Sequence, residues 1–391
     1  MTTKSVLMIT PRLTRDGGVA AHVNCSARAL AQHGLTVSVI AARVEPQDTI
    51  PGVQVIERRN LMNANVSVEE RLGDRVWGSP DVIHLHQVEN LDLLDDLRGT
   101  SPSVLSAHGY TACTSGVHYF KPGQECNRAH GPGCIPNLAR CGHTRYPKTL
   151  PAKYRNASRG LAALRRSDFA VSYSTAVDRH LRANGIGDRA VVPYFPTMPA
   201  REGSGHEGRR RVVFAGRMVR SKGVGILIRA ARDVDGEFVL CGDGREIEAL
   251  RALADSLGLS DRIRFTGWLD GGELAAELAE ASVVVVPSLW PEPFGLVGIE
   301  ALAAGRPVVA SATGGVPDWL QDGVGGLAVP PGDPARLAQA LDEMLADTAR
   351  QREMGQAGKH FVEQRFTADL HVERLIDVYS RAQALWEAAR R

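Results

Sequence analysis

The sequence predicts an α/β protein built from two doubly wound domains. Short apolar runs alternate with helical patterns from one end of the chain to the other, which implies parallel sheets covered by helices on both faces. A length of 391 residues is also long for a single hydrophobic core. Residues 194–210 are rich in proline, glycine and charge and lack periodicity, so we interpret them as a linker. A cleft is expected between the two domains.

The first domain is expected over residues 1–195. Apolar runs of strand length predict buried strands at residues 4–10, 35–41, 80–86, 102–109 and 168–174. Helical periodicity predicts helices at residues 19–34, 91–99 and 153–166. Strands and helices therefore alternate along this half of the chain.

The second domain is expected over residues 210–370, where the same alternation recurs. Its buried strands are predicted at residues 211–217, 237–244, 262–268, 282–288 and 306–311. The chain ends in a long helical pattern. We expect residues 371–391 of this helix to cross back and pack on the first domain.

Composition excludes several classes of protein. A hydrophobic content of 43% and a charged content of 23% are typical of a soluble globular protein, and a net charge of +2 does not indicate a nucleic-acid binder. No apolar run approaches the roughly 20 residues that span a bilayer. The apolar stretch near the N-terminus is too short for a signal peptide and is better interpreted as the first strand. We expect a cytoplasmic protein, with peripheral contact at the inner face of the membrane as an option.

Ligands in doubly wound sheets bind beyond the carboxyl ends of the strands, so each candidate motif should follow a strand. Asp16-Gly17-Gly18 lies between the first strand and the first helix. Its glycines allow close approach of the backbone, and the helix N-terminus offers N–H groups to an anion. A tight turn without a ligand is the alternative interpretation. The spacing is not G-x-G-x-x-G, so a dinucleotide site is poorly supported.

Cationic and glycine-rich segments follow strands of the second domain. Arg217 and Lys222 flank a turn after the strand at 211–217, where they could neutralise a diphosphate. Two ordinary surface cations are the alternative. Gly242-Asp243 and Trp268 follow the next two strands and are weaker candidates for ligand binding.

The segment PEPFGLVGIEALAAGRPVVAS, residues 291–311, carries the most specific pattern. Glu292 precedes an expected helix and Glu300 lies one to two turns inside it, so both carboxylates can accept hydrogen bonds from the hydroxyls of one ligand. The N–H groups around Phe294, Gly295 and Leu296 would face an anion. Gly295 and Gly298 cost stability in a helix, which indicates that something other than packing selected them.

The pattern E-P-F-G-x4-E-A-x-A-x-G-x-P-V-V-A, with G-R-x4-K-G upstream and a glycine pair after the first strand, resembles the retaining glycosyltransferases of family 4. The resemblance covers nearly the whole chain. It implies a GT-B fold, in which two Rossmann-like domains face a central cleft. It also implies transfer of a hexose or N-acetylhexosamine from a UDP- or GDP-linked donor to a hydroxyl acceptor that the sequence does not identify. By resemblance, Gly314-Gly315 matches a glycine pair of the family, although Asp318 stands where glutamate is commoner.

The resemblance also implies roles for single residues of the donor site. Arg217 and Lys222 would hold the donor diphosphate, with Gly17 and Gly18 on its other side. Glu300 would bind the ribose hydroxyls of the nucleotide, and Glu292 the hydroxyls of the transferred sugar.

His108, at the end of the strand at 102–109, matches the family's active-site histidine and would contact the donor sugar; a histidine without a catalytic role is the alternative. No side chain is an obvious covalent nucleophile. The family's mechanism is therefore expected, in which the acceptor attacks on the face that the diphosphate leaves. No catalytic cofactor or metal is expected, because cations and helix dipoles can supply the positive charge.

Other classes of function remain open on this reasoning. A sugar-nucleotide epimerase or phosphorylase could use a similar two-domain scaffold, although a phosphorylase would require a cofactor-bearing lysine and a longer chain. A non-catalytic nucleotide-sugar binding protein is the third reading. Hydrolysis of the donor without acceptor would separate the enzyme from the binding protein.

A cysteine-rich insert is expected at residues 110–147. It contains Cys113, Cys126, Cys134 and Cys141, together with His118, His130 and His143. In a cytoplasmic protein this density favours a structural zinc site over disulfides. No C-x2-C pair is present, so disulfides and thiols without metal stay open as alternatives.

Between residues 126 and 167 the chain has no acidic residue. The basic residues of this run are Arg128, Arg140, Arg145, Lys148, Lys153, Arg155, Arg159, Arg165 and Arg166. A solvated face is the usual explanation of such a run. An anionic or lipid-linked acceptor, or a membrane surface, is the functional alternative.

Overall fold

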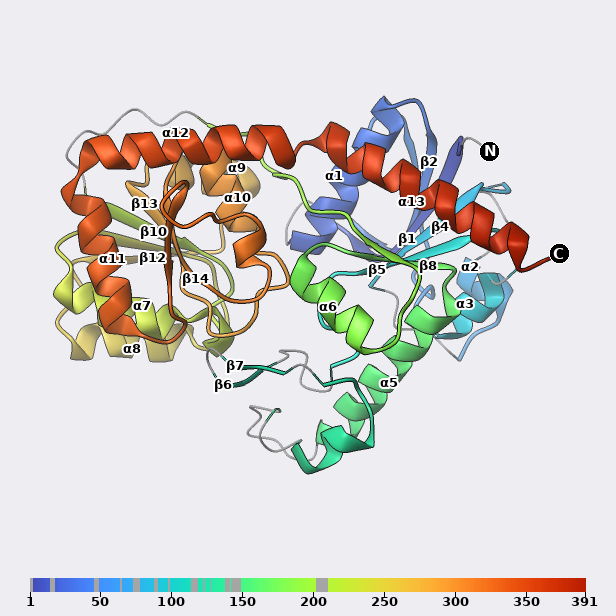
Figure 1. Cartoon of the computed structure of the whole chain (residues 1–391), viewed down its shortest axis with the longest axis horizontal. Coiled ribbons are helices and arrows are strands. Elements are labelled where there is room, and N and C mark those ends of the chain that lie inside the picture. Colours follow the sequence, from blue (N-terminus) through green and yellow to red (C-terminus); the bar gives the residue numbers. More distant parts are fainter. Residues whose placement is uncertain are drawn as a thin grey trace. The chain divides into compact units, whose positions relative to one another are not determined.

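The computed structural model describes residues 3–14, 18–45, 49–63, 65–72, 78–87, 91–97, 99–113, 119–121, 124–126, 128–137, 141, 149–201 and 210–391. The chain forms two compact units (Figure 1). Unit 1 consists of Met1–His118, Asn127–Tyr194 and Ala368–Arg391, and unit 2 of Tyr119–Cys126 and Phe195–Thr367. The second unit therefore includes a short piece of the cysteine-rich insert.

Unit 1 is built on a parallel seven-stranded sheet. In spatial order its strands are β3 (Val53–Glu57), β2 (Thr36–Val44), β1 (Ser5–Leu13), β4 (Val82–His86), β5 (Ser103–Ala107), β8 (Phe169–Ser172) and β9 (Arg189–Val191). Its helices are α1 (Gly18–Gln32), α2 (Val68–Leu72), α3 (Leu91–Leu97), α5 (Leu150–Arg166), α6 (Thr175–Ala183) and α13 (Ala368–Ala388), with the 3₁₀ turn η1 (Pro132–Asn137).

The two faces of this sheet differ in chemistry. Alternate residues of a strand point to opposite faces. Ile83 and Leu85 of β4 belong to an apolar core with residues of α3, α5 and α6. His84, between them, instead hydrogen-bonds Tyr379 of α13 through Nδ1 at 2.8 Å. One face is thus apolar and the other carries buried histidine.

Unit 2 contains a parallel six-stranded sheet. Its strands in spatial order are β12 (Ile263–Gly267), β11 (Glu237–Cys241), β10 (Arg211–Ala215), β13 (Val283–Val286), β14 (Val308–Ser311) and β15 (Gly326–Val329). Its helices are α7 (Val224–Ala230), α8 (Ile247–Ser256), α9 (Gly271–Ala279), α10 (Leu296–Ala303), α11 (Pro334–Ala346) and α12 (Thr348–Arg365). The shorter pieces are η3 (Arg220–Lys222), η4 (Ala231–Asp233), η5 (Val316–Asp318) and the antiparallel hairpin β6 (Tyr119–Lys121) and β7 (Gln124–Glu125).

The predicted fold class is confirmed, and every strand predicted in either half is present. Val283–Val286 is buried throughout, as expected of a strand inside a parallel sheet with both faces covered. Strands β3 and β9 lie at the edges of the unit 1 sheet and were not predicted. Their residues are mostly half-buried or exposed, so they lack the continuous apolar run that marks the inner strands.

Each sheet has a point where the strand order reverses. In unit 1 the reversal falls between β1 and β4, and in unit 2 between β10 and β13. Chain segments leave opposite faces of the sheet there, which opens a crevice at the carboxyl ends of the strands. A ligand site in unit 2 is therefore expected at the loops after β10 and β13.

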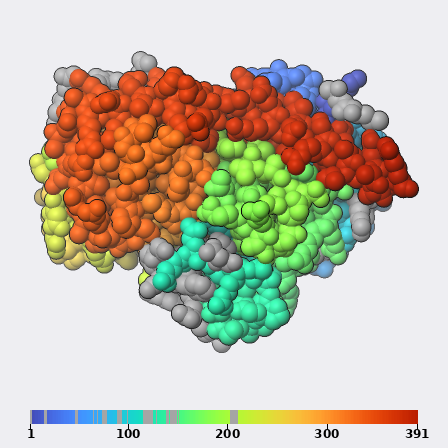
Figure 2. Space-filling model, in the orientation of Figure 1, coloured from blue at the N-terminus to red at the C-terminus, as the bar shows by residue number. Residues whose placement is uncertain are grey.

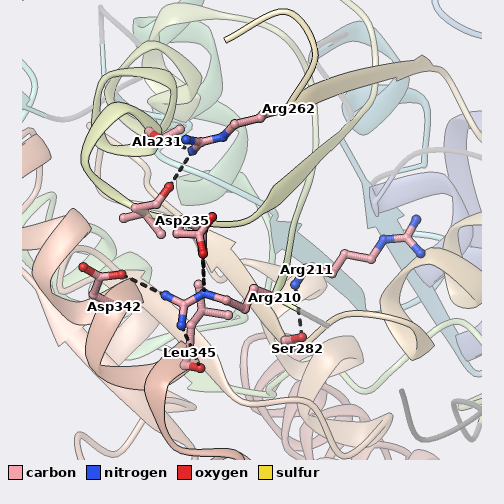
Figure 3. Close-up of polar contacts among 9 residues, drawn as sticks. Arg210, Arg211, Ala231, Asp235, Arg262, Ser282, Asp342 and Leu345 are labelled. Carbon is pink, nitrogen blue, oxygen red and sulfur yellow. Dashed lines mark hydrogen bonds and ion pairs between the residues drawn. The ribbon is translucent and has the colours of Figure 1, made fainter. Parts of the chain in front are cut away.

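The opposite end of the unit 2 sheet is occupied by structural contacts (Figure 3). Arg210, just before β10, donates from Nε to the carbonyl of Asp235 at 2.6 Å and from Nη2 to Asp342 at 3.1 Å. Arg262, just before β12, donates to the carbonyl of Ala231. These arginines satisfy carbonyl groups at the amino ends of the strands and leave the carboxyl ends to the candidate site.

Helix α13 packs against α1 and the sheet of unit 1. Its inner side buries His371, Val372, Leu375, Val378 and Tyr379, while other residues of the helix lie at the molecular surface (Figure 2). Among the described residues, no helix has the length and apolar character needed to cross a bilayer.

Candidate functional site

A lysine and a glutamate meet at the reversal point of the unit 2 sheet. Lys222, in the loop after β10, places Nζ 2.8 Å from Oε1 of Glu292, in the loop after β13. The same oxygen accepts hydrogen bonds from Trp290 Nε1 at 2.9 Å and from the hydroxyl of Ser288. Glu292 is only 3% exposed. Burial alone would raise its pKa, but Lys222 and these donors hold the pKa below its ordinary value. Glu292 is therefore a carboxylate at neutral pH.

Backbone contacts bring the two loops together. The N–H of Leu289 donates to the carbonyl of Ser221 at 2.8 Å. Gly223 has φ +73°, and a Cβ on it would lie 1.8 Å from the carbonyl oxygen of Pro287. Only glycine permits this approach, so the glycine after Lys222 has a packing reason as well as a conformational one.

Arg217 differs from Lys222. Its side chain is exposed, and within the described part of the chain its guanidinium forms no ion pair or hydrogen bond. The loop that carries it is nevertheless held, because the N–H of Met218 donates to the carbonyl of Asp243 at 2.8 Å. Gly242 packs so closely on this loop that a Cβ would lie 2.0 Å from the carbonyl oxygen of Gly216. Arg217 thus presents an uncommitted charge from an ordered loop.

The loops after β11 and β12 also lie at the carboxyl ends of the unit 2 strands. The N–H of Gly242 donates to the carbonyl of Gly267 at 2.8 Å. Asp243 is exposed, and its carboxylate accepts from the N–H of Gly244 at 2.6 Å. Trp268, directly after β12, is 53% exposed. An exposed indole beside ordered backbone is suited to stacking on a flat ligand.

Helix α10 begins at Leu296, after Gly295 in the left-handed region with φ +94°. No side chain caps its N-terminus and its first turn holds no acidic residue, so the first N–H groups are suited to an anion. Glu300 is 9% exposed and accepts at Oε1 from Thr197, whose hydroxyl oxygen is 2.8 Å away and whose backbone nitrogen is 3.4 Å away. Burial raises the pKa of Glu300, and the donors of Thr197 oppose that shift.

The expectation that something other than packing selected Gly298 is wrong. A Cβ at Gly298 would lie 2.1 Å from the ring of Trp319. Trp319 is fully buried and donates from Nε1 to the carbonyl of Phe294 at 2.6 Å. The Trp319 indole therefore packs directly against the backbone of α10 at Gly298, and this packing explains why the residue is glycine.

The glycine pair after β14 lies beside Glu292. The N–H of Gly315 donates to the carbonyl of Glu292 at 2.7 Å. Gly314 has φ +65°, and its N–H donates to the carboxylate of Glu125 at 2.9 Å. Glu125 comes from β7 of the insert, and the sequence analysis missed this contact. No spacing in the sequence relates it to Gly314, so the sequence carried no usable signal. Asp318 ends η5 in this region.

In unit 1, His108 follows β5 and both of its ring nitrogens are engaged. Nε2 lies 3.0 Å from Nδ1 of His86, and Nδ1 lies 2.6 Å from the hydroxyl of Tyr194. Desolvation lowers the pKa of His108 to about 3. Of the predicted glycine pair, Gly18 is the first residue of α1 and Gly17 lies outside the described residues.

His108, itself half-buried, belongs to a cluster of buried side chains that the sequence analysis did not find. Its other members are His22, His84, His86, His371, Tyr173, Tyr194 and Tyr379. Desolvation holds the pKa of His22, His84 and His86 well below the ordinary value, and that of His371 at about 4. The H-x-H pattern inside an apolar strand at residues 84–86 was the available signal.

The zinc site stays a prediction. Cys113, Cys126, Cys134 and Cys141 are all described, but His118 and His143 lie outside the described residues. Among residues that the structure does describe, no group of three or more His, Cys, Asp or Glu side chains could hold a metal ion.

The second domain matches a known family. Residues 199–361 match the family described as "Glycosyl transferases group 1". A D-inositol 3-phosphate glycosyltransferase of Salinispora tropica is 38% identical over 187 residues, which are 44% of this chain and 38% of that protein. An alpha-maltose-1-phosphate synthase of Mycobacterium tuberculosis is 33% identical over 234 residues, 52% of this chain and 57% of that protein. The chain thus spans between about two fifths and three fifths of the length of these relatives.

A solved structure is similar over nearly the whole chain. Anabaena HepE, in complex with UDP and glucose, superposes with a TM-score of 0.72 at 19% identity, covering 96% of this chain and 99% of that one. At this identity the likeness shows the fold alone. That fold is the GT-B fold predicted from the sequence, with two Rossmann-like domains.

Proposed function

Because residues 199–361 match the group 1 glycosyl transferases, we propose that the protein is a retaining glycosyltransferase. It moves a hexose or N-acetylhexosamine from a UDP- or GDP-linked donor to a hydroxyl group of the acceptor. The observation that carries the proposal is the contact of Lys222 with Glu292 at the point where the sheet order reverses. A cation and a carboxylate at that point suit the two halves of a nucleotide sugar, its diphosphate and its hydroxyl-rich sugar.

Each donor group has a matching partner in unit 2. Arg217 and Lys222 bind the diphosphate, together with the uncapped N-terminus of α10. Glu292 binds hydroxyls of the sugar and Glu300 those of the ribose. Trp268 and the backbone at Gly242 and Asp243 lie at the same edge of the sheet, where they contact the nucleotide. The HepE complex, which contains UDP and glucose, supports this class of donor.

The reaction keeps the configuration of the anomeric carbon. The acceptor oxygen forms its bond to that carbon on the face from which the diphosphate departs. The bond between carbon and the diphosphate oxygen breaks, its electrons stay with the diphosphate, and a phosphate oxygen takes the acceptor's proton. Lys222 and Arg217 stabilise the charge that develops on the leaving group. We assign them this role in place of a catalytic metal.

His108 is unsuited to be the base of an inverting reaction. Both ring nitrogens are already hydrogen-bonded, and its pKa of about 3 is far from neutral. The family resemblance alone supports the proposal that His108 contacts the donor sugar. This assignment supports the retaining mechanism over an inverting one.

The acceptor is anionic or lipid-linked. Arg128 and the residues Arg155, Arg159, Arg165 and Arg166 of α5 are exposed, and such a charged surface attracts phosphate groups. The two bacterial relatives named above carry phosphorylated compounds in their names. We place the protein at the inner face of the membrane, as a peripheral protein. Sedimentation with vesicles of phosphatidylcholine, with and without phosphatidylglycerol, tests this, and an Arg155→Glu/Arg159→Glu variant is the control.

Proton NMR of the anomeric signal tests the reaction. An α-linked donor should give an α-linked product, and a β-linked product would overturn the retaining mechanism. Donor hydrolysis in the absence of acceptor separates the enzyme from a nucleotide-sugar binding protein. If UDP- and GDP-sugars are neither bound nor hydrolysed, the proposed donor class is wrong.

A further inference from the structure

Glu300 is held by a residue far away in the sequence. Thr197 lies near the start of Phe195–Thr367, the larger segment of unit 2. Its hydroxyl and its backbone N–H both donate to Oε1 of the Glu300 carboxylate. In the described part of the chain, no hydrogen bond reaches Oε2 of this carboxylate. One oxygen is therefore committed to the protein and the other is not.

Glu292 shows the same division. Lys222, Ser288 and Trp290 all approach its Oε1, and within the described chain Oε2 accepts no hydrogen bond. Both glutamates of the pattern E-x7-E thus have one oxygen fixed by neighbouring donors. A side chain fixed in this way loses less rotamer entropy when a ligand binds to its second oxygen.

We propose that Thr197 is a positioning residue for nucleotide recognition, which fixes Oε1 of Glu300 so that Oε2 is presented to the ribose hydroxyls. This inference rests on the proposed function, in which Glu300 binds the ribose. A buried carboxylate without donors is strongly disfavoured. Thr197 supplies two donors, which oppose the rise in the pKa of Glu300 that burial causes and fix the carboxylate oxygen that accepts them.

The Thr197 hydroxyl could instead compete with the ribose for Glu300, and experiment separates this role from the positioning role. If the Thr197 hydroxyl merely occupied the place of a ribose hydroxyl, its removal would free Glu300 and strengthen nucleotide binding. A positioning role predicts weaker binding. The two readings therefore predict opposite signs for one measurement.

The test is calorimetric titration of the full chain with UDP and with GDP. Thr197→Val removes the hydroxyl with little change of shape and should weaken the better of the two nucleotides by at least about tenfold, since the lost bond is to a charged group. Thr197→Ser retains the hydroxyl and should bind within about threefold of the unmodified protein. Thr348→Val is the matched control, because Thr348 is an exposed residue at the start of α12 and should leave affinity unchanged.

The corresponding 2′,3′-dideoxynucleoside diphosphate isolates the ribose. Its affinity should be nearly the same for the unmodified protein and for Thr197→Val. The positioning role is wrong if Thr197→Val binds the ribonucleotide as tightly as the unmodified protein does, or more tightly. It is also wrong if Thr197→Val loses the same factor of affinity for the ribonucleotide and for the dideoxynucleotide. In both cases the proposed function stands. If neither UDP nor GDP binds the unmodified protein, the proposed function fails and this inference fails with it. Should Thr197→Val unfold, Thr197→Ala serves in its place.

Discussion

The ammonium group of Lys222 lies 2.8 Å from a carboxylate oxygen of Glu292, although 70 residues separate the two in sequence. Lys222 comes from the loop after β10 and Glu292 from the loop after β13, the two strands that flank the reversal of the unit 2 sheet. The pair therefore joins a diphosphate-binding candidate to a sugar-binding candidate in one charge cluster.

Lys222→Met should lower both activity and stability. Loss of a charge-assisted contact to the diphosphate should cost about 1.5–3 kcal/mol of transition-state stabilisation, measured from kcat/KM. Glu292 would then be a buried carboxylate without its cation, which should reduce the free energy of unfolding by about 1–3 kcal/mol in urea denaturation. Adding Glu292→Gln should recover stability but not activity. A Lys222→Met protein of unchanged stability would show that the ion pair contributes little.

Arg217→Ala is the matched comparison, because the Arg217 side chain is exposed and forms no described ion pair. Its free energy of unfolding should change by less than about 0.5 kcal/mol. Transfer should still lose about 1.5–3 kcal/mol of transition-state stabilisation. If kcat/KM hardly moves in either this variant or Lys222→Met, the diphosphate is bound elsewhere.

Glu300→Ala should weaken donor binding without harming the fold. The side chain is buried and its pKa is raised, so the charged group itself costs folding energy. Thermal unfolding should therefore occur at the same temperature as in the unmodified protein or slightly above it. Calorimetry with the nucleoside diphosphate should show a clear loss of affinity. Unchanged affinity in a folded Glu300→Ala protein would remove the ribose-binding role.

The histidines of the unit 1 cluster, all buried except the half-buried His108, make stability depend on pH. In the folded chain His22, His84, His86, His108 and His371 have lowered pKa values, about 3 for His108 and about 4 for His371. Unfolded histidine titrates near pH 6.5, so below that pH the unfolded chain binds more protons. Stability should be constant above about pH 7 and should fall as pH drops from about 6.5 towards 4, by up to about 1.4 kcal/mol per pH unit for each histidine.

Urea denaturation at pH 5, 6, 7 and 8 measures this dependence. Glu292, whose pKa is lowered from 4.5, would lose its contribution only below that value. Glu300, whose pKa is raised, would add stability as pH falls, so a loss of stability between pH 6.5 and 5 reports on histidine. Equal free energies of unfolding at pH 7 and pH 5 would mean that these histidines take up protons over the same pH range in the folded and the unfolded chain.

Metal analysis of protein purified without chelator should find about one zinc per chain, bound by residues that include Cys126, Cys134 and Cys141. Serine variants of these cysteines should lose the metal. Cys241→Ala should keep it, since Cys241 is buried in β11 and burial raises the pKa of its thiol to about 11. Absence of metal, with the insert thiols readily titrated in the native protein, would refute the zinc site.

Much of the fold was predictable because inner strands of parallel sheets are buried on both faces. Val283–Val286 shows this directly in its sequence. The edge strand Arg189–Val191 was not predictable, since half-buried residues carry no continuous apolar signal. The same limit applies to the hairpin of the insert, whose Glu125 reaches the N–H of Gly314.

By itself, the sequence determined which residues carry the candidate chemistry in unit 2. Arg217, Lys222 and Glu292 stand out because they follow strands, and Glu300 because it lies at a fixed spacing from Glu292 in the next helix, which is local information. Only the tertiary structure decided how they are held, since Lys222 with Glu292 and Thr197 with Glu300 are pairs of residues far apart in sequence. It also decided the reason for Gly298, which lies against Trp319, and it assembled the histidine cluster from α1, β4, the end of β5 and α13. Contacts of this kind depend on how elements pack across a sheet, and no short-range pattern of residues records that packing.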